Sequence, residues 1–593
     1  MSEQAAGTRR VSCGELRGED AGSVVEIAGW VHRRRDHGGL YFIDLRDRDG
    51  LTQVVFGPDH TEAFSAAESL HAEDVVRVTG AVRKRPAGTE NPKLATGEVE
   101  IEAHALVFLN RSLTPPFVVS SEGDVDESLR LRYRYLDLRR PRLQHNLTIR
   151  HKIVKAMRDY FDEHAFLEIE TPNLIKSTPE GARDFLVPSR VHPGTFYALP
   201  QSPQILKQIC MIGGLGRYMQ IARCFRDEDP RADRQPEFTQ LDVEMSFVTE
   251  DDVLEVMEGC MRFVWKRVLD VDVAPMLRLR HAEALRRFGS DKPDMRFGLE
   301  LSDVAQRFAG SGIGFLEPFA TGGEATRIVA VRYPGGAALS RRDFDLLTET
   351  AKQFGAGGLV WISFAADGWK SSIAKLLNEE LVAGLRADGG AEEGDALLIV
   401  AGSYAQASDI AGRLRLEVGD RLGLRDPKEF AFCWIVGFPL FERDAETEEI
   451  TFAHHPFTSP APGQEDLFDS APLQMRALHY DMVLNGSELG SGSIRNHNPD
   501  VQRKIFQLLG MDDAEIDDRF GFLMEALLYG APPHGGMALG IDRIAMIACG
   551  ESNIREVTAF PKNQQFRDVM MDAPSAVAKK QLDELALELK AKP

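Results

Sequence analysis

The chain has 593 residues, enough for several domains, and its 43% hydrophobic and 27% charged residues are typical of a globular protein. It contains no apolar run of the roughly 18 residues that a membrane span needs, and its first ten residues lack the apolar core of a signal peptide. The six cysteines are scattered and form no Cys-x-x-Cys pair, which argues against a disulfide framework or a thiolate zinc site. We therefore expect a cytoplasmic protein without a membrane segment.

The net charge of −21 disfavours nucleic-acid binding if the chain is taken as a whole. Three local runs are nevertheless basic, at residues 32–35, 83–85 and 139–142. A positive face, not a positive total, attracts phosphate groups. Each run taken alone is equally compatible with ordinary solvated arginines, so charge leaves RNA binding open.

Residues 22–110 have the pattern of short strands. The alternating segments 40–46 and 51–56 flank the turn Asp49-Gly50, which indicates a hairpin. Together with a helix near 61–71, the pattern predicts a five-stranded oligonucleotide-binding (OB) barrel, whose other strands are 24–31, 75–82 and 98–101. In such a barrel Phe42 and Gln53 would face outward, where a ring can stack on a base and an amide can hydrogen-bond it. For Phe42 alone, core packing is the commoner role.

The rest of the chain predicts a multidomain α+β protein. Residues 111–140 resemble a linker, and the apolar spacing of 143–164 predicts a helix, followed by a strand at 166–172 that ends at a proline. From there to 287 the alternation of strands and helices suits a mixed antiparallel sheet. Residues 289–428 are rich in Gly-Gly pairs and predict an inserted α+β domain, and the final residues predict a short helix.

Two segments about 300 residues apart carry the clearest chemical signal. Residues 224–229 (Cys-Phe-Arg-Asp-Glu-Asp) and 234–242 (Arg-Gln-Pro-Glu-Phe-Thr-Gln-Leu-Asp) put arginines, acids and a phenylalanine around a turn. Residues 535–543 put a glycine-rich run ahead of an apolar helix, with Arg543 at the junction. Guanidinium groups suit phosphate oxygens and a ring suits adenine, so both segments are suited to a bent nucleoside triphosphate. A single arginine would more often form a surface salt bridge. A salt bridge does not explain why arginine, acids and phenylalanine occur together in the complete segments 224–229 and 234–242.

A pair of carboxylates, Asp481 and Glu488, flanks Asn485-Gly486. Carboxylate oxygens of this kind suit Mg²⁺ that also binds phosphates. Two acids seven residues apart are usually just solvated, and only the surrounding string from 480 to 495 favours the metal.

These blocks resemble motifs 2 and 3 of the class II aminoacyl-tRNA synthetases, and the sequence between them is similar to the bacterial-type aspartyl enzymes, of the form that does not discriminate between tRNA(Asp) and tRNA(Asn). The 166–172 strand resembles motif 1, which implies a homodimer. The loop 179–184 and the string 288–294 also occur in family order. The resemblance implies an anticodon-binding OB domain at 1–110, a hinge at 111–140, a catalytic domain at 141–288 and 429–565, a bacterial insertion at 289–428 and a C-terminal extension at 566–593.

The resemblance also assigns residues to the site, among them three catalytic groups, Arg226, Glu488 and Arg543. It implies ATP contacts from Arg226, Asp227, Glu228, Gln235, Phe238, Glu488, Gly540, Ile541, Asp542 and Arg543. It implies L-aspartate contacts from Glu180, Gln204, Lys207, Arg226, Asp242, His454 and Arg495. It implies Mg²⁺ on Asp481 and Glu488, and anticodon contacts from Arg35, Phe42 and Gln53. The usual Gly-Gly-Gly of the family is Gly490-Ser491-Gly492 here, and because serine is small we expect no loss.

The reaction implied is ATP-dependent activation of L-aspartate to aspartyl-adenylate, followed by transfer to tRNA. His37 and Gly88 resemble the relaxed type that accepts both tRNA(Asp) and tRNA(Asn), since glycine leaves room and histidine is an adaptable donor or acceptor. The alternative is a discriminating enzyme that charges tRNA(Asp) only.

Three other functions are less compatible with the sequence. An amide-forming ligase that makes asparagine without RNA would not need the N-terminal barrel. A non-catalytic RNA-binding paralogue should have lost Arg226, Glu488 or Arg543. A site for lysine is opposed by Arg495 with Lys207, and the same pair disfavours asparagine.

Overall fold

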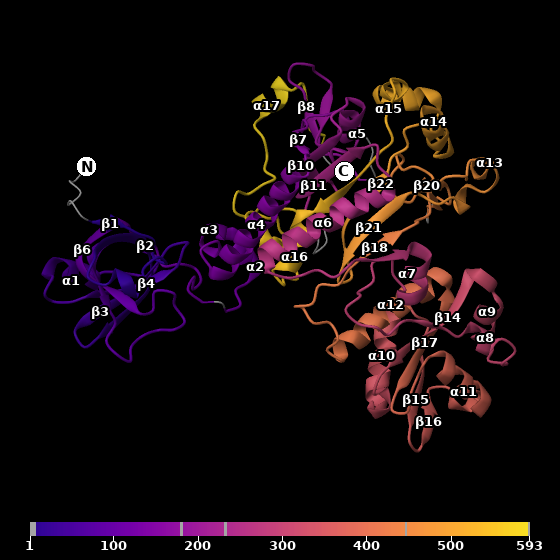
Figure 1. Cartoon of the computed structure of the whole chain (residues 1–593), viewed down its shortest axis with the longest axis horizontal. Coiled ribbons are helices and arrows are strands. Elements are labelled where there is room, and N and C mark those ends of the chain that lie inside the picture. The colour runs from indigo at the N-terminus through magenta and orange to yellow at the C-terminus, as the bar shows by residue number, and fades with distance from the viewer. Residues whose placement is uncertain (1–7, 122, 178–181, 230–233, 445–446, 591–593) are drawn as a thin grey trace. The chain divides into compact units, whose positions relative to one another are not determined.

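The computed structural model describes residues 8–590 except 122, 178–181, 230–233 and 445–446. The chain divides into two compact units. One contains Met1–Thr148 with Arg555–Ala576, and the other contains Ile149–Ile554 with Val577–Pro593. Figure 1 shows the elements of each unit along the chain.

The N-terminal unit contains the expected OB barrel. Its strands hydrogen-bond in the order β2-β3-β4-β6-β5, and β5 pairs again with β2, so the sheet closes on itself. One helix lies between β4 and β5, and β4 runs parallel to β6, as in OB-folds. The elements are β1 (Arg9–Arg10), β2 (Val24–His37), β3 (Leu40–Arg46), β4 (Leu51–Phe56), α1 (Thr61–Glu68), β5 (Val75–Lys84) and β6 (Val99–Asn110).

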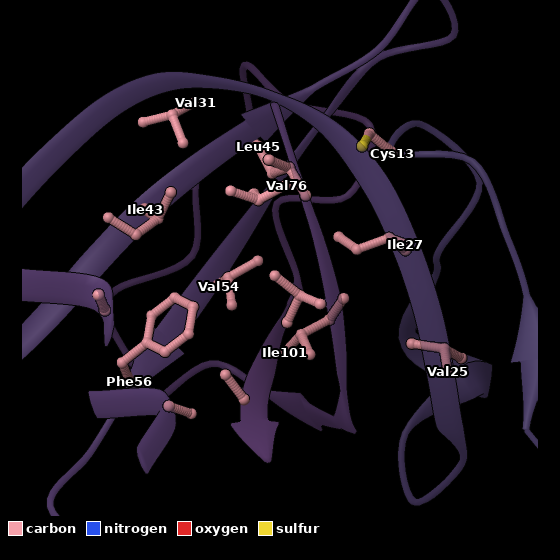
Figure 2. Close-up of a cluster of buried hydrophobic side chains, with 14 of the residues drawn as sticks. Cys13, Val25, Ile27, Val31, Ile43, Leu45, Val54, Phe56, Val76 and Ile101 are labelled. Atoms are coloured by element: carbon pink, nitrogen blue, oxygen red, sulfur yellow. The ribbon is translucent and has the colours of Figure 1, made fainter. Parts of the chain in front are cut away.

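Alternation of apolar and polar residues builds the inside of this barrel. Every second side chain of β2 is buried over Val25, Ile27 and Val31, and Ile43, Leu45 and Val54 join them from the next two strands. Figure 2 shows these side chains converging on one interior. The intervening positions therefore point outward.

Short helices α2 (Glu127–Arg132) and α3 (Arg134–Asp137) follow the barrel and pack with residues 555–576. The side chain of Arg134 is 2% exposed and donates to the carbonyl oxygens of Arg555, Thr558 and Ala559. Arg130 forms a two-point ion pair with Glu556 at 2.7 and 3.1 Å. The predicted linker is thus ordered by buried arginines.

The second unit is built on an eight-stranded sheet in the order β12-β18-β21-β22-β23-β11-β10-β7. All neighbouring strands are antiparallel except the two outer pairs, β12–β18 and β10–β7. The strands are β7 (Leu167–Glu168), β10 (Arg217–Phe225), β11 (Glu237–Ser246), β12 (Leu277–Arg280), β18 (Phe432–Val436), β21 (His479–Leu484), β22 (Ser487–Ile494) and β23 (His534–Gly540). The predicted antiparallel sheet is therefore confirmed.

Helices support this sheet. They include α4 (Pro141–Glu163), α5 (Gln204–Ile212), α6 (Glu250–Leu269), α7 (His281–Phe288), α14 (Pro499–Leu508), α15 (Asp513–Leu528) and α16 (Ile541–Ala548). Helix α6 begins with a capping box between Thr249 and Asp252 and buries an apolar stripe that ends at Trp265. The strand predicted at 166–172 is only two residues long, because the chain leaves the sheet after Ile169 donates to Met219.

A separate five-stranded sheet, in the order β13-β14-β17-β15-β16, is formed between Ser302 and Ser403. Its strands are β13 (Ser302–Asp303), β14 (Thr326–Tyr333), β15 (Val360–Ala365), β16 (Gly368–Ser371) and β17 (Ala396–Ser403), and its larger helices are α10 (Arg341–Gln353), α11 (Glu379–Asp388) and α12 (Tyr404–Arg421). Two buried apolar clusters cover it. The predicted C-terminal helix is α17 (Lys579–Glu584).

Candidate active site

A cleft of about 660 Å³ lies over the central strands of the eight-stranded sheet. Its walls come from β11, β21, β22 and β23 and from the starts of α5 and α16, with loops that include Arg226 and His454. The lining includes most of the residues that the sequence assigned to the site: Gln204, Arg226, Glu228, Gln235, Phe238, Asp242, His454, Asp481, Glu488, Arg495, Gly540, Asp542 and Arg543. Segments more than 300 residues apart in the chain therefore meet in one cavity.

Four charged side chains form a buried cluster at one end of the cleft, where Asp242 and Arg495 are lining residues and Lys207 and Glu244 are not. The Lys207 ammonium lies 3.0 Å from Asp242 Oδ1 and 3.6 Å from Glu244 Oε2. Arg495 donates from Nε and Nη2 to the two oxygens of Glu244 at 2.9 and 3.0 Å. All four residues are at most 1% exposed. The two cations are thus fixed in place before any ligand arrives.

The two acids of this cluster are not equivalent. Burial raises the pKa of Asp242, and Lys207 opposes this only in part. Burial also acts to raise the pKa of Glu244, but Arg495 and Lys207 outweigh it and hold that pKa below its usual range. Glu244 is therefore the permanent counter-ion of Arg495.

Glu244 was missed by the sequence analysis. A signal existed, because Asp242 and Glu244 are two residues apart on one strand and so face the same side. Gly536 on the adjacent strand makes room for it, since a Cβ there would lie 2.2 Å from Glu244 Oε2. This close approach explains one glycine of the 535–543 run structurally.

Five cleft residues carry buried polar atoms without a hydrogen-bond partner in the described part of the chain. They are Gln204 Nε2, Arg226 Nε, Asp242 Oδ2, His454 Nδ1 and His479 Nδ1. Buried polar groups are normally paired, so unpaired ones in a cavity are suited to ligand atoms. Gln204 Nε2 and Arg226 Nε are donors suited to oxygen, Asp242 Oδ2 is an acceptor suited to an ammonium group, and each histidine nitrogen donates or accepts according to the tautomer of its ring.

The other end of the cleft is suited to a nucleotide. The guanidinium carbon of Arg226 lies 5.1 Å from the centre of the Phe238 ring, because β10 and β11 pair Cys224 with Phe238. Arg543, at the first turn of α16, donates to the carbonyl oxygen of Glu488. Arg234 forms an ion pair with Glu228 beside them. Cations and an aromatic face thus line one wall.

Some residues assigned to ATP make structural contacts in the protein itself. The carboxylate of Asp542 accepts hydrogen bonds from Arg150 at 2.6 Å and from the Thr239 backbone N–H at 2.9 Å, so it holds α16 against α4 and β11. The side chain of Ile541 is fully buried, and Asp227 contributes a backbone hydrogen bond to Arg183. Neither Ile541 nor Asp227 is among the residues lining the cleft. Glu180 lies outside the described residues.

The residues expected to hold Mg²⁺, Asp481 and Glu488, both line the cleft from adjacent strands. Burial and the neighbouring charge of Asp481 raise the pKa of Glu488, and a cation between them would relieve that repulsion. Within the described residues no group of three or more His, Cys, Asp or Glu side chains has the arrangement of a metal site. The donor set fits an ion that takes its remaining ligands from phosphate and water.

A hydrogen-bonded chain that the sequence did not reveal crosses the floor of the cleft. Ser491 Oγ lies 3.0 Å from His454 Nε2 and 2.8 Å from His479 Nε2, and that same nitrogen lies 2.9 Å from Asp481 Oδ1. His455 Nε2 lies 2.8 Å from Arg495 Nη1. No spacing rule connects these residues, because they come from three separate segments.

The candidate anticodon residues lie on the outer face of the barrel. Arg35 pairs with Phe42 across β2 and β3, and it donates to Asp44 at 2.7 Å and to Gln53 at 3.2 Å. Gln53 also donates to Glu100 at 2.8 Å and is largely buried. Phe42 is half-buried on this outer face and is not among the barrel core residues.

The two residues assigned to tRNA choice, His37 and Gly88, are exposed. Gly88 has a φ of +85°, which favours glycine, and no atom lies within 4 Å of the position of a Cβ.

Comparison with known proteins identifies the fold and the family. A model of class II tRNA synthetases (D, K and N) matches residues 126–564, and a model of the OB-fold nucleic acid binding domain matches residues 25–109. The chain belongs to the class II aminoacyl-tRNA synthetases.

Full-length relatives of this synthetase carry a more specific name. An aspartate–tRNA(Asp/Asn) ligase of Moorella thermoacetica is 53% identical over 98% of this chain and 97% of its own length. One of Rubrobacter xylanophilus is 52% identical over 98% and 97%.

Solved structures share the fold of the synthetase. Asparaginyl-tRNA synthetase of Pyrococcus horikoshii, in complex with asparaginyl-adenylate, matches with a TM-score of 0.57 at 19% identity, covering 93% of this chain and 97% of that one. A putative aspartyl-tRNA synthetase of Leishmania major matches with a TM-score of 0.59 at 20% identity, covering 95% and 96%. In the described part of the synthetase, no helix is long and apolar enough to span a membrane.

Proposed function

We propose that this synthetase is an aspartate–tRNA(Asp/Asn) ligase that uses ATP. The observation that carries the proposal is a pair of buried cations at a cleft that also contains Arg226 and Phe238: Arg495 lines the cleft, and Lys207 is paired with the lining residue Asp242. A substrate with a side-chain carboxylate is matched by fixed positive charge. The names of the full-length relatives agree with this substrate.

Selection against asparagine follows from burial. A neutral amide in place of the carboxylate would give Lys207 and Arg495 no charged acceptor beyond Asp242 and Glu244 in this buried site. Sites built to pair a charged or hydrogen-bonding substrate group reject an analogue that lacks it, because their own buried groups stay unpaired. Lysine is excluded by direct repulsion.

In the proposed first step, the α-carboxylate of aspartate attacks the α-phosphorus of ATP. A new P–O bond forms, the bond to the β-phosphate breaks, and pyrophosphate leaves with its electron pair. Arg226 would stabilise the charge that develops on the α-phosphate, Arg543 would hold the γ-phosphate, and Phe238 would stack on adenine. Asp242 Oδ2 would accept from the substrate ammonium group.

Mg²⁺ bound by Asp481 and Glu488 would neutralise phosphate charge. In the second step a hydroxyl of the terminal tRNA adenosine attacks the aspartyl carbonyl, and AMP leaves. Positioning and charge neutralisation carry both steps, and no protein nucleophile is required.

We further propose that the barrel binds the anticodon through Arg35, Phe42 and Gln53, and that His37 and Gly88 permit both tRNAs. The exposure of His37 and Gly88 supports this, since an anticodon loop could reach them. A homodimer formed along the motif 1 strand is supported by β7, an edge strand whose Leu167 is 50% exposed. We assign the protein to the cytoplasm and retain the domain limits of the sequence analysis.

Aminoacylation of the two purified tRNA transcripts tests the function. Radiolabelled aspartate should be transferred to tRNA(Asp) and to tRNA(Asn). Transfer to tRNA(Asp) alone would establish the discriminating alternative, and transfer to neither would overturn the proposal.

A further inference from the structure

Ser491 stands where the family resemblance leads one to expect glycine, and its hydroxyl lies between two histidines. The Oγ atom is 3.0 Å from His454 Nε2 and 2.8 Å from His479 Nε2. His479 Nε2 is in turn 2.9 Å from Asp481 Oδ1. Ser491 therefore connects a residue at the aspartate end of the cleft with a residue at the metal end.

The donors and acceptors along this chain can be assigned from the number of protons available. An ionised carboxylate only accepts hydrogen bonds, so His479 Nε2 is assigned the proton that it shares with Asp481 and Ser491. The hydroxyl proton of Ser491 then has His454 Nε2 as its acceptor among the described residues. In this arrangement His454 Nε2 is unprotonated and the ring proton of His454 lies on Nδ1.

Burial makes the neutral ring the relevant form. His454 is surrounded by His479, His455, Arg495 and Lys207, and burial together with these neighbours lowers its pKa well below 6.5. A neutral imidazole has one N–H, so the atom that carries it depends on which nitrogen accepts a hydrogen bond.

Stacking fixes the plane of the ring. The rings of His454 and His479 are parallel within 2° at a centroid distance of 4.1 Å, and Phe438 stacks on the far side of His479 at 4.1 Å. In the described part of the chain, Nδ1 of His454 is buried and has no hydrogen-bond partner. A donor held in a lined cleft without an acceptor is ready for an oxygen of the bound substrate.

We propose that Ser491 is a positioning residue that fixes the tautomer of His454, so that the ring presents its Nδ1–H to a carboxylate oxygen of the substrate amino acid. The proposal rests on the proposed function, because it requires aspartate in this cleft. Glycine at this position would leave His454 free to adopt either tautomer, and only one of them donates from Nδ1.

The test is the KM for aspartate in ATP–pyrophosphate exchange by Ser491→Ala and Ser491→Gly. Loss of one hydrogen bond predicts a KM for aspartate that is higher by roughly threefold to tenfold, with the KM for ATP changed by less than about twofold. Ser487→Ala, the same substitution at the other end of β22, should leave both constants unchanged. Thermal midpoints within a few degrees of wild type would show that the variants fold.

A double-mutant cycle with His454→Ala separates positioning from a general structural effect. In the His454→Ala background, Ser491→Ala should raise the KM for aspartate by less than about 1.5-fold, because the ring that it orients is gone. Three outcomes would overturn the inference: the same rise in the KM for aspartate in both backgrounds, an equal rise in the KM for ATP, or no change in the single variants. In each case aspartate-dependent exchange by the wild type would still uphold the proposed function. Absence of aspartate-dependent exchange by wild type would overturn both.

Discussion

Glu244 fixes both cations of the proposed aspartate pocket although it is not among the residues that line the cleft. It holds Arg495 by two hydrogen bonds and lies 3.6 Å from Lys207, so one acid orients both cations. Its position two residues from Asp242 gives one strand the counter-ions of the whole cluster. The charge cluster is therefore a preformed unit, and not four separate contacts.

Replacement of this acid should cost both stability and binding. In Glu244→Gln the buried guanidinium of Arg495 loses its charged partner, and breaking a buried ion pair costs about 3–5 kcal/mol. We expect a lower free energy of unfolding in urea and a higher KM for aspartate. Glu237→Gln, on the same strand but partly exposed and paired with Arg223, is the control and should change stability by less than about 1 kcal/mol. Equal effects of the two substitutions would contradict this role for Glu244.

Arg226 should matter for chemistry more than for folding. Its Nε is among the unpaired buried atoms and its guanidinium lies over Phe238, so Arg226→Ala removes the group that we propose to contact the nucleotide. We predict a loss of about 10²–10³-fold in the rate of ATP–pyrophosphate exchange with little change in thermal midpoint. Arg223→Ala, an exposed position on the preceding strand β10, should retain exchange. Near-normal exchange by Arg226→Ala would remove the phosphate assignment.

At the scale of elements, helix α12 of the five-stranded domain holds the segment 289–299, which connects α7 to β13. Arg415 on α12 is 1% exposed and donates to the carbonyl oxygens of Asp294, Phe297, Gly298 and Leu299. Gly289 permits the close approach of this segment, since a Cβ there would lie 2.2 Å from the Ser408 carbonyl oxygen. The same segment carries Asp291, which lines the cleft.

Arg415→Met should therefore loosen this junction. Four carbonyl groups, of which that of Asp294 makes a fully buried hydrogen bond, would lose their donor. We expect a destabilisation of about 2–4 kcal/mol, read as a lower thermal midpoint and faster proteolysis near residues 294–299. Arg413→Met is the matched control on the same helix, because Arg413 is exposed and pairs with Asp409. A midpoint shift no larger than that of the control would show that the junction does not depend on Arg415.

The sequence predicted elements best where the pattern was local. The hairpin of β3 and β4 and the long helix α4 follow from alternation, a turn and apolar spacing, and the structure has both. The length of the motif 1 strand was overestimated. Pro172 marks the end of an extended segment, but it does not show how many residues of that segment hydrogen-bond to a neighbouring strand. Strand β6 continues to Asn110, nine residues beyond the predicted end, since its pairing with β5 is a tertiary feature.

At the scale of the whole molecule, the site residues could be named from motifs, but their mutual contacts could not. Arg226, Glu488 and Arg543 stand in recognisable strings. Glu244, His479 and Ser491 have their contacts on other strands, and only the register of β11, β23, β22 and β21 brings those contacts together.

Stability of the protein should fall as the solution becomes mildly acidic. Burial lowers the pKa of His454, His455, His281 and His534, all with an ordinary value of 6.5. The unfolded chain has the ordinary pKa and therefore binds protons that the folded state excludes. The contribution of these histidines to the free energy of unfolding is therefore fully present above pH 6.5 and is lost as the pH falls below that value. We expect the thermal midpoint to drop between about pH 7.5 and about pH 5.5, and to drop less in a His454→Asn/His455→Asn variant. A midpoint independent of pH in this range would contradict the burial of neutral histidines.

The barrel should serve transfer to tRNA and not activation. Phe42→Ala should raise the KM for tRNA by roughly tenfold, because stacking on a base contributes about 1–3 kcal/mol, while ATP–pyrophosphate exchange stays at the wild-type level. Val107→Ala, an exposed apolar position on β6, is the control and should leave charging unchanged. Equal charging by Phe42→Ala and wild type would exclude Phe42 from the interface.

The central claim is that fixed cations select an acidic amino acid beside a bound nucleotide. Its most direct test is ATP–pyrophosphate exchange by the wild-type protein with each of aspartate, asparagine and lysine as the only amino acid. We expect exchange with aspartate and at most about one hundredth of that rate with asparagine or lysine at equal concentration. Comparable exchange with asparagine, or none with aspartate, would contradict it.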